Sequence, residues 1–190
     1  MLVRLLILLI LYSLVYSQSY PYWFIYPSRI NCTDISVGYA ISSYYSDTTL
    51  SAAFKNGCEN YAKNKLAYVS GGQGFKSTEI GTIWVGSDIS LTYDTSLAKS
   101  AENSLMIIDS FTVGRFEAVL LSSSSCDVPS RYVNLSNFDN PKWIETLPLS
   151  SRSIYAVGTS ETYYYESSSW MTAEANARVE LAKTLNSEVS

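Results

Sequence analysis

Apolar residues alternate with small ones along the segment 35–42 of the chain. The apolar positions are Ile35, Val37, Tyr39 and Ile41. A period of two predicts a half-buried β-strand, and Gly38 on the opposite face indicates a bulge or a close approach of another backbone. A helical stripe of mostly small residues follows Asp47, which is a residue type typical of N-caps. The stripe consists of Leu50, Ala53, Gly57 and Tyr61.

The same pattern returns 120 positions later, where residues 141–190 match residues 21–70 without a gap. The matched pairs include Pro21/Pro141, Trp23/Trp143, Gly38/Gly158, Tyr44-Tyr45/Tyr164-Tyr165 and Asn56/Asn176. The second segment therefore predicts a strand at 155–159, Ser167 as an N-cap and a helix with a matching stripe. An internal match of this kind is typical of a duplicated structural unit.

Further strands are predicted at residues 80–85 and 89–93, which are rich in β-branched and aromatic residues. Residues 105–121 favour a hairpin that turns at Val113-Gly114, although spacing of apolar residues at 97–105 leaves a short helix open. The fold class that follows is α+β, with a helix packed on one face of an antiparallel sheet and the unit partly duplicated in tandem.

The predicted division of the chain has four parts. They are a signal peptide at 1–17, a complete unit at 20–122, a linker at 123–139 and a partial copy, strand plus helix, at 140–190. Two explanations of the partial copy stay open: the chain is a fragment, or the last strand–helix unit packs on another sheet, in this chain or in a partner.

The N-terminal segment has the pattern of a cleavable secretory signal peptide. One positive charge at Arg4 precedes an apolar run over 5–15 and a small residue, Ser17, at the expected cleavage point. The apolar run is shorter than the roughly 20 residues that a membrane span needs. No cysteine stands at the cleavage point to accept a lipid. We expect a secreted or periplasmic protein without a transmembrane span in the mature chain.

The charge of the chain argues against one class of partner. The net charge is −4, and no cluster of basic residues occurs. Nucleic-acid binding is not expected, because its affinity comes largely from lysine and arginine at the phosphates. The 16 tyrosines and 4 tryptophans suit both sheet surfaces and exposed contact faces.

If the chain is secreted, its three cysteines pass through an oxidising compartment, where disulfide bonds form. Cys32 and Cys58 both lie in the first unit, and their matched positions, Arg152 and Arg178, both lack cysteine. This joint absence is consistent with a Cys32–Cys58 disulfide and also with coincidence. Cys126 is then left over, either free or paired between chains.

No catalytic, cofactor-binding or metal site is expected from the residue types. The chain has no histidine, which removes the commonest general base and metal ligand. The three cysteines lack the CxxC spacing of zinc sites. The carboxylates are scattered, and we expect a solvated surface rather than a glycosidase-like pair. The chain is therefore predicted not to be an enzyme.

The order of elements resembles a known group of envelope proteins. The features that match are the Pro-x-Trp start, the strand ending in Val-Gly, helix ends at 61–63 and 181–183, and a strand pair at 107–111 and 116–121. They are similar to the Lpp-twenty lipoprotein family and to the related N-terminal domain of flagellar assembly protein T. The resemblance implies an α+β domain of the bacterial envelope, often membrane-tethered, without known enzymatic chemistry. This chain departs from the family in lacking the lipid-accepting cysteine.

Two functions in different classes are the resulting hypotheses. One is assembly or protein–protein interaction in the cell envelope, with itself or with a larger structure such as a flagellar base. The other is glycan binding by exposed aromatic rings. In both, the candidate contact surface is the tyrosines before the two helices: Tyr44, Tyr45, Tyr163, Tyr164 and Tyr165. The alternative is that these rings only fasten each loop to its own helix.

Overall fold

The computed structural model describes residues 19–32, 34–71, 73–78, 81–87, 89–134, 141–147, 149 and 154–188, without the side chains of 28, 73–78, 81–87 and 186–188. The predicted signal peptide lies outside these residues, as do 135–140 of the predicted linker and repeat. The chain divides into two compact units, one holding residues up to 31 with 127–146, the other 32–126 with 147 onwards. The predicted division differs, because it assigns 20–31 and 140–146 to separate repeats.

The first unit is built on a short antiparallel ladder between β1 (Ser19–Pro21) and β9 (Tyr132–Asn134). β9 lies inside the predicted linker and was not expected. A single turn of helix, α2 (Tyr22–Ile25), follows Pro21, and the 3-10 turn η1 (Pro27–Arg29) comes next. The matching turn α5 (Lys142–Glu145) follows Pro141. Trp23 is the largest fully buried side chain described in this unit.

The second unit contains a three-stranded antiparallel sheet in the order β2 (Ser36–Ile41), β8 (Phe116–Ser122), β7 (Met106–Val113). β7 and β8 form the predicted hairpin, and its turn lies at Gly114, where φ is +58°. α4 (Thr95–Ser104) precedes the hairpin, so the helix and the hairpin both exist. The α4 N-cap is Asp94, whose carboxylate accepts hydrogen bonds from Ser96 N–H and Leu97 N–H.

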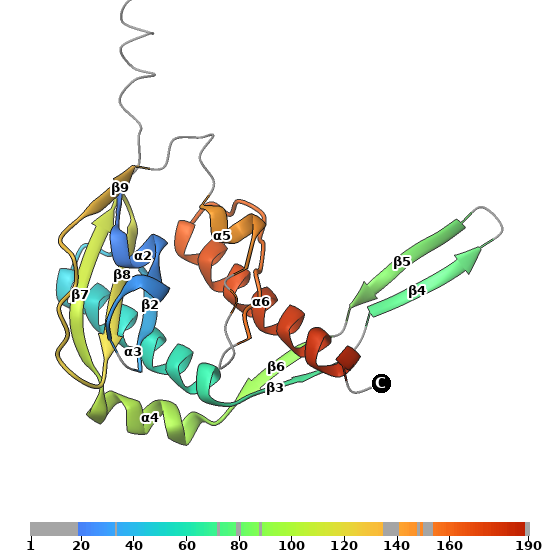
Figure 1. Ribbon diagram of the computed structural model, residues 1–190, viewed down its shortest axis with the longest axis horizontal. Coiled ribbons are helices and arrows are strands. Elements are labelled where there is room, and N and C mark those ends of the chain that lie inside the picture. The colour runs from blue at the N-terminus through green and yellow to red at the C-terminus, as the bar shows by residue number, and fades with distance from the viewer. Residues whose placement is uncertain are drawn as a thin grey trace, which may run out of the picture. The chain divides into compact units, whose positions relative to one another are not determined.

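α3 (Ser46–Lys65) packs on one face of this sheet and runs beside β2 in Figure 1. The small residues of its stripe let α3 approach the sheet closely. A Cβ atom added to Gly57 would lie only 2.5 Å from Leu121 Cδ1 of β8. The core between helix and sheet contains buried aliphatic and small residues: Ala40, Ala53, Cys58, Ala101, Leu105, Val119 and Leu121. The predicted N-cap Asp47 lies instead in the first turn of α3, where a negative charge favours the helix dipole.

Two further ladders complete the strands of the second unit. β3 (Ala67–Ser70) pairs with β6 (Ser90–Tyr93), and β4 (Gln73–Thr78) pairs with β5 (Gly81–Ser87), both antiparallel. β5 and β6 correspond to the strands predicted at 80–85 and 89–93. The α+β prediction, with antiparallel sheets and a helix on one face, is therefore confirmed.

α6 (Glu166–Glu188) is the helix predicted for the partial copy. The strand predicted at 155–159 does not join a ladder, because no residue from 154 to 163 is in a strand. The segment nevertheless lies against its own helix, since a Cβ atom on Gly158 would overlap the Ala173 carbonyl oxygen. Gly38 and Ala53, 120 positions earlier, make the same contact. The tandem duplication itself stays a prediction from the sequence.

Candidate functional site

The loop before α3 presents two tyrosines to solvent. Tyr44 and Tyr45 are 94% and 69% exposed, and their rings meet edge to face with centroids 5.3 Å apart. Hydrogen bonds with the hydroxyl groups of Thr48 and Thr49 hold the loop backbone in place. Ser43 N–H donates to Thr49 Oγ1 at 2.9 Å, and the Thr48 hydroxyl donates to the Tyr45 carbonyl at 2.7 Å. The fold thus holds the loop in place without using the Tyr44 ring.

The loop before α6 has nearly the same construction. Tyr163 N–H donates to Ser169 Oγ at 3.0 Å, and the Tyr164 and Tyr165 rings meet edge to face at 4.8 Å. Tyr164 is 87% exposed and Tyr163 is 47% exposed. Such exposure of Tyr44 and Tyr164 argues against the alternative in which these rings fasten each loop to its own helix.

Arg115, in the β7–β8 turn, links the two tyrosine loops. Its carbonyl oxygen accepts a hydrogen bond from Ser42 N–H at 2.7 Å, beside the first loop. Its guanidinium lies 5.3 Å from the centre of the Tyr165 ring, in the second loop. Arg115, a cation that the sequence pattern does not single out, therefore connects the two loops that hold the predicted contact residues. We call Tyr44, Tyr45, Arg115, Tyr164 and Tyr165 the tyrosine end.

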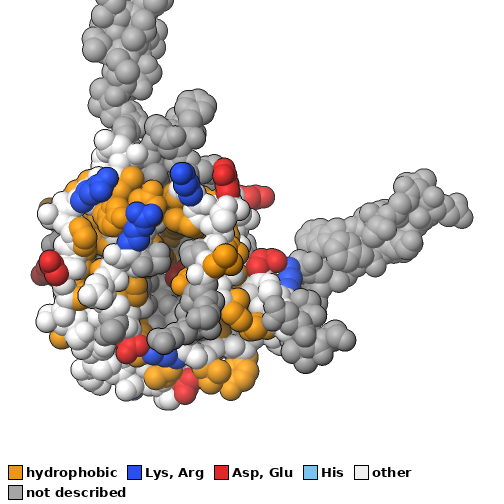
Figure 2. Space-filling model, in the orientation of Figure 1, with side chains coloured by type: hydrophobic (Ala, Val, Ile, Leu, Met, Phe, Trp, Pro, Cys, Tyr) orange, Lys and Arg blue, Asp and Glu red, His pale blue; other side chains and the backbone are white. Residues whose placement is uncertain are grey.

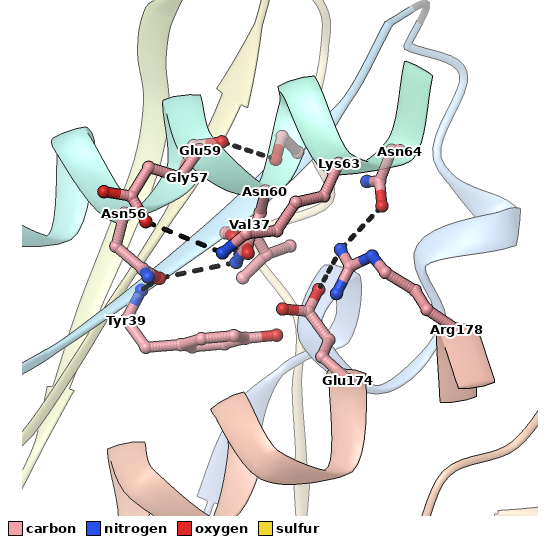
Figure 3. Close-up of polar contacts among 11 residues, drawn as sticks. Val37, Tyr39, Asn56, Gly57, Glu59, Asn60, Lys63, Asn64, Glu174 and Arg178 are labelled. Carbon is pink, nitrogen blue, oxygen red and sulfur yellow. Dashed lines mark hydrogen bonds and ion pairs between the residues drawn. The ribbon is translucent and has the colours of Figure 1, made fainter. Parts of the chain in front are cut away.

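A second polar cluster lies at the edge of β2 that does not face β8 (Figure 3). Tyr39 N–H donates to Asn56 Oδ1 at 2.9 Å, and Asn60 Nδ2 donates to the Val37 carbonyl at 2.9 Å. Both amides come from α3. They occupy backbone groups that a neighbouring strand would otherwise pair with, so they protect this edge from further strand addition.

α6 adds an ion pair beside this edge. Arg178 Nη2 donates to Asn64 Oδ1 at 2.7 Å and lies 3.7 Å from Glu174 Oε1. Figure 3 shows the Tyr39 ring extending toward Glu174. Burial raises the pKa of Glu174, opposed by the charges of Arg178 and Lys63. Burial also raises the pKa of Tyr39, and the Glu174 charge adds to that shift.

Two buried atoms of this ion pair have no hydrogen-bond partner among the described residues: Glu174 Oε2 and Arg178 Nε. The periodicity of α6 does not single out either residue, because both fall beside the small-residue stripe rather than on it. Asn56 did carry a signal, since Asn176 matches it, and Asn176 Nδ2 donates to the Thr159 carbonyl at 2.7 Å. In both segments an asparagine of the helix contacts the extended segment before it.

The predicted Cys32–Cys58 disulfide is wrong. Cys32 is bonded to Cys126, and Cys58 is a free, buried thiol. β2 and β8 are antiparallel neighbours, so the residues that precede β2 and follow β8 meet at one end of the sheet. Cys58 faces the core from the middle of α3, and burial raises its pKa to about 11. Cys126 is therefore neither free nor paired between chains.

The described residues contain no group of His, Cys, Asp and Glu side chains placed to hold a metal ion. Several carboxylates serve local contacts: Glu117 accepts a hydrogen bond from the Thr112 hydroxyl, and Glu166 accepts one from Trp170 Nε1. A cavity of about 460 Å³ lies between α6 and β6, with Asn176, Glu180 and Lys183 among its polar lining residues.

Acidic, basic and apolar side chains are interspersed on the face drawn in Figure 2. No described helix has both the length and the apolar character for crossing a bilayer.

Comparisons with family models, with curated proteins and with solved structures found no match to this chain. A functional assignment therefore rests on the residues and their geometry.

Proposed function

We propose that this chain is a non-enzymatic, secreted or periplasmic protein of the cell envelope that acts in assembly through protein–protein contacts at the tyrosine end. The observation that carries the proposal is that Arg115 contacts both tyrosine loops, on which Tyr44, Tyr45 and Tyr164 are exposed. Tyrosine and arginine are enriched at protein interfaces and among the residues that dominate their binding energy. The resemblance to envelope families is consistent with this role.

The disulfide supports the proposed location. Cys32 and Cys126 are linked, and such bonds are typical of proteins that mature in oxidising compartments. The predicted signal peptide at 1–17 agrees with that route.

Site-specific crosslinking in the native host tests the role of the tyrosine end. A photoreactive p-benzoylphenylalanine replaces Tyr44 or Tyr164, and the control places it at Tyr68, which is 60% exposed on β3. We expect one protein to be captured from both positions of the tyrosine end and not from the control. Capture from all three positions alike, or from none, would contradict the proposal.

Glycan binding is the second candidate, favoured by the high exposure of Tyr44 and Tyr164. The negative face of an aromatic ring attracts the C–H-rich face of a sugar. Electrophoresis through gels that contain envelope polysaccharide separates the two candidates. Retardation that is lost with Tyr44→Ala plus Tyr164→Ala, but kept with Tyr68→Ala, would favour the glycan. Unchanged migration together with specific crosslinks would favour the protein partner.

A further inference from the structure

The segment 154–160 packs against α6 as β2 packs against α3, yet it belongs to no ladder. A Cβ atom on Gly158 would lie 2.9 Å from the Ala177 Cα of α6. No backbone–backbone hydrogen bond involves residues 154–160 within the described part of the chain. We propose that this segment is an acceptor strand, which takes an extended segment of a partner protein as an antiparallel neighbour.

β2 provides the template for this proposal. Gly38 approaches Ala53 and Gly57 of α3 as Gly158 approaches Ala173 and Ala177 of α6. β2 has β8 as its ladder neighbour, and there Gly38 and Gly57 are buried and Ala53 is 0% exposed. The corresponding residues beside 154–160 all remain partly exposed. The segment 154–160 thus packs on a helix as β2 does, but has no ladder neighbour among the described residues.

The edge that accepts the partner follows from alternation along the strand. Asn176 Nδ2 donates to the Thr159 carbonyl, as Asn56 accepts from Tyr39 N–H, so the odd-numbered residues face the asparagine side. Backbone groups of successive residues point to opposite edges. The N–H and C=O groups of Ala156, Gly158 and Ser160 therefore face the open edge. Their counterparts in β2 lie opposite Leu121, Val119 and Glu117 of β8.

A second copy of the same segment does not fit this edge. α3 covers β8 as well as β2, since Gly57 lies against the Leu121 side chain. Two identical strand–helix units paired about a twofold axis would hold two helices on one face, over strands about 4.8 Å apart. Packed helices need about 8–10 Å between their axes. The occupant is therefore a strand that carries no helix over it.

The chemistry of the occupant follows from β8. Val119 and Leu121 are 0% exposed and belong to the core under α3. The partner strand should carry aliphatic residues of that size at alternate positions facing α6. Addition of a strand to an exposed edge is a known mode of peptide recognition, in which backbone hydrogen bonds supply affinity and alternate side chains supply specificity.

A fusion of the chain's own hairpin tests the acceptor strand. A copy of residues 105–122 is appended after Ser190 through a Gly/Ser linker of about 20 residues, which reaches about 25 Å. The control fusion carries Val119→Asp and Leu121→Asp in the appended copy only. Amide hydrogen exchange is measured by NMR. We expect at least tenfold slower exchange at Ala156, Gly158 and Ser160 in the first fusion than in the control. Equal exchange in the two fusions would overturn the proposal.

Two proline variants sharpen the test. In the fusion, Ala156→Pro removes an N–H group on the open edge and should abolish the slowed exchange at Gly158. Val157→Pro removes one on the other edge and should leave it intact. Equal effects of the two variants would overturn the predicted edge. Sedimentation of the unfused chain is expected to give a monomer, and a dimer lost only with Ala156→Pro would overturn the choice of occupant. None of these readouts involves the tyrosine end.

Discussion

Gly38 on β2 and Gly57 on α3 face each other so closely that a Cβ atom on Gly38 would lie 2.8 Å from the Gly57 Cα. The same Cβ atom would overlap the Ala53 carbonyl oxygen. Both obstacles are backbone atoms, which cannot move aside as a flexible side chain can. The contact therefore sets the distance between helix and sheet, and with it the position of the Asn56 and Asn60 amides at the β2 edge.

Replacement of Gly38 by alanine should destabilise the fold strongly. The added methyl group forces α3 away from β2, and we expect a loss toward the upper end of about 1–3 kcal/mol. Gly158→Ala is the matched variant, since its Cβ atom meets the same backbone groups of α6. The segment 154–160 is in no ladder and can shift outward, so its loss should be below about 1 kcal/mol. Urea unfolding measures both; equal losses would contradict this account.

Loss of the asparagine at the β2 edge should also cost stability. Asn56→Ala leaves the Tyr39 N–H group without its acceptor beside a buried ring, and we expect a cost of about 1–3 kcal/mol. Asn176→Ala removes the corresponding contact to an exposed carbonyl, that of Thr159, where water substitutes, so its cost should stay within about 0.5 kcal/mol. Thermal unfolding of the two variants, compared with the wild type, tests the difference.

The Cys32–Cys126 bond should contribute substantially to stability. It links residues 94 positions apart, and a long closed loop restricts the unfolded chain. Removal of such a bond typically costs roughly 2–5 kcal/mol. Denaturation of the double variant Cys32→Ser plus Cys126→Ser measures the loss, with Cys58→Ser as the control that keeps the bond. Peptide mapping without reduction should recover Cys32 linked to Cys126, and a Cys32–Cys58 peptide would refute the assignment.

Cys58 should make stability depend on pH in the alkaline range. Burial raises the pKa of its thiol from 9.0 to about 11 in the folded chain. The unfolded chain therefore releases this proton first, so the contribution to stability is complete below about pH 9 and is lost as pH rises through about 11. Measured between these values, the free energy of unfolding should fall more steeply for the wild type than for Cys58→Ala. Parallel curves would show that the thiol is not buried as described.

Local sequence patterns were enough to predict several helices and strands. The alternation at 35–42 predicted β2, and the small stripe beyond Asp47 predicted α3, because burial on one face imposes those periods directly. Gly38 was expected to allow a close approach of another backbone, and it does. The tyrosines were identified from their place before each helix. The connection of their two loops through Arg115 was not predicted, because it depends on the β7–β8 turn reaching both loops.

The cysteines mark the limit of such reasoning. Their positions in the repeat favoured Cys32 with Cys58, but the geometry of antiparallel neighbours brings Cys32 to Cys126. β9 was missed for a related reason, since three residues in a polar stretch become a strand only when β1 pairs with them. Periodicity contains no information about partners that lie far away in the sequence.

By itself the sequence determined the kinds of element, their approximate bounds and the recurrence of one pattern at a spacing of 120 residues. Those properties are local, because propensity and hydrophobic period act over a few turns or strand residues. Tertiary structure alone decided which edges are paired, protected or open. Asn56 protects one edge of β2 and β8 covers the other, whereas the edge at Gly158 has no ladder neighbour in the described part of the chain. Long-range packing makes that choice, since a backbone group is satisfied only by what the whole fold brings beside it.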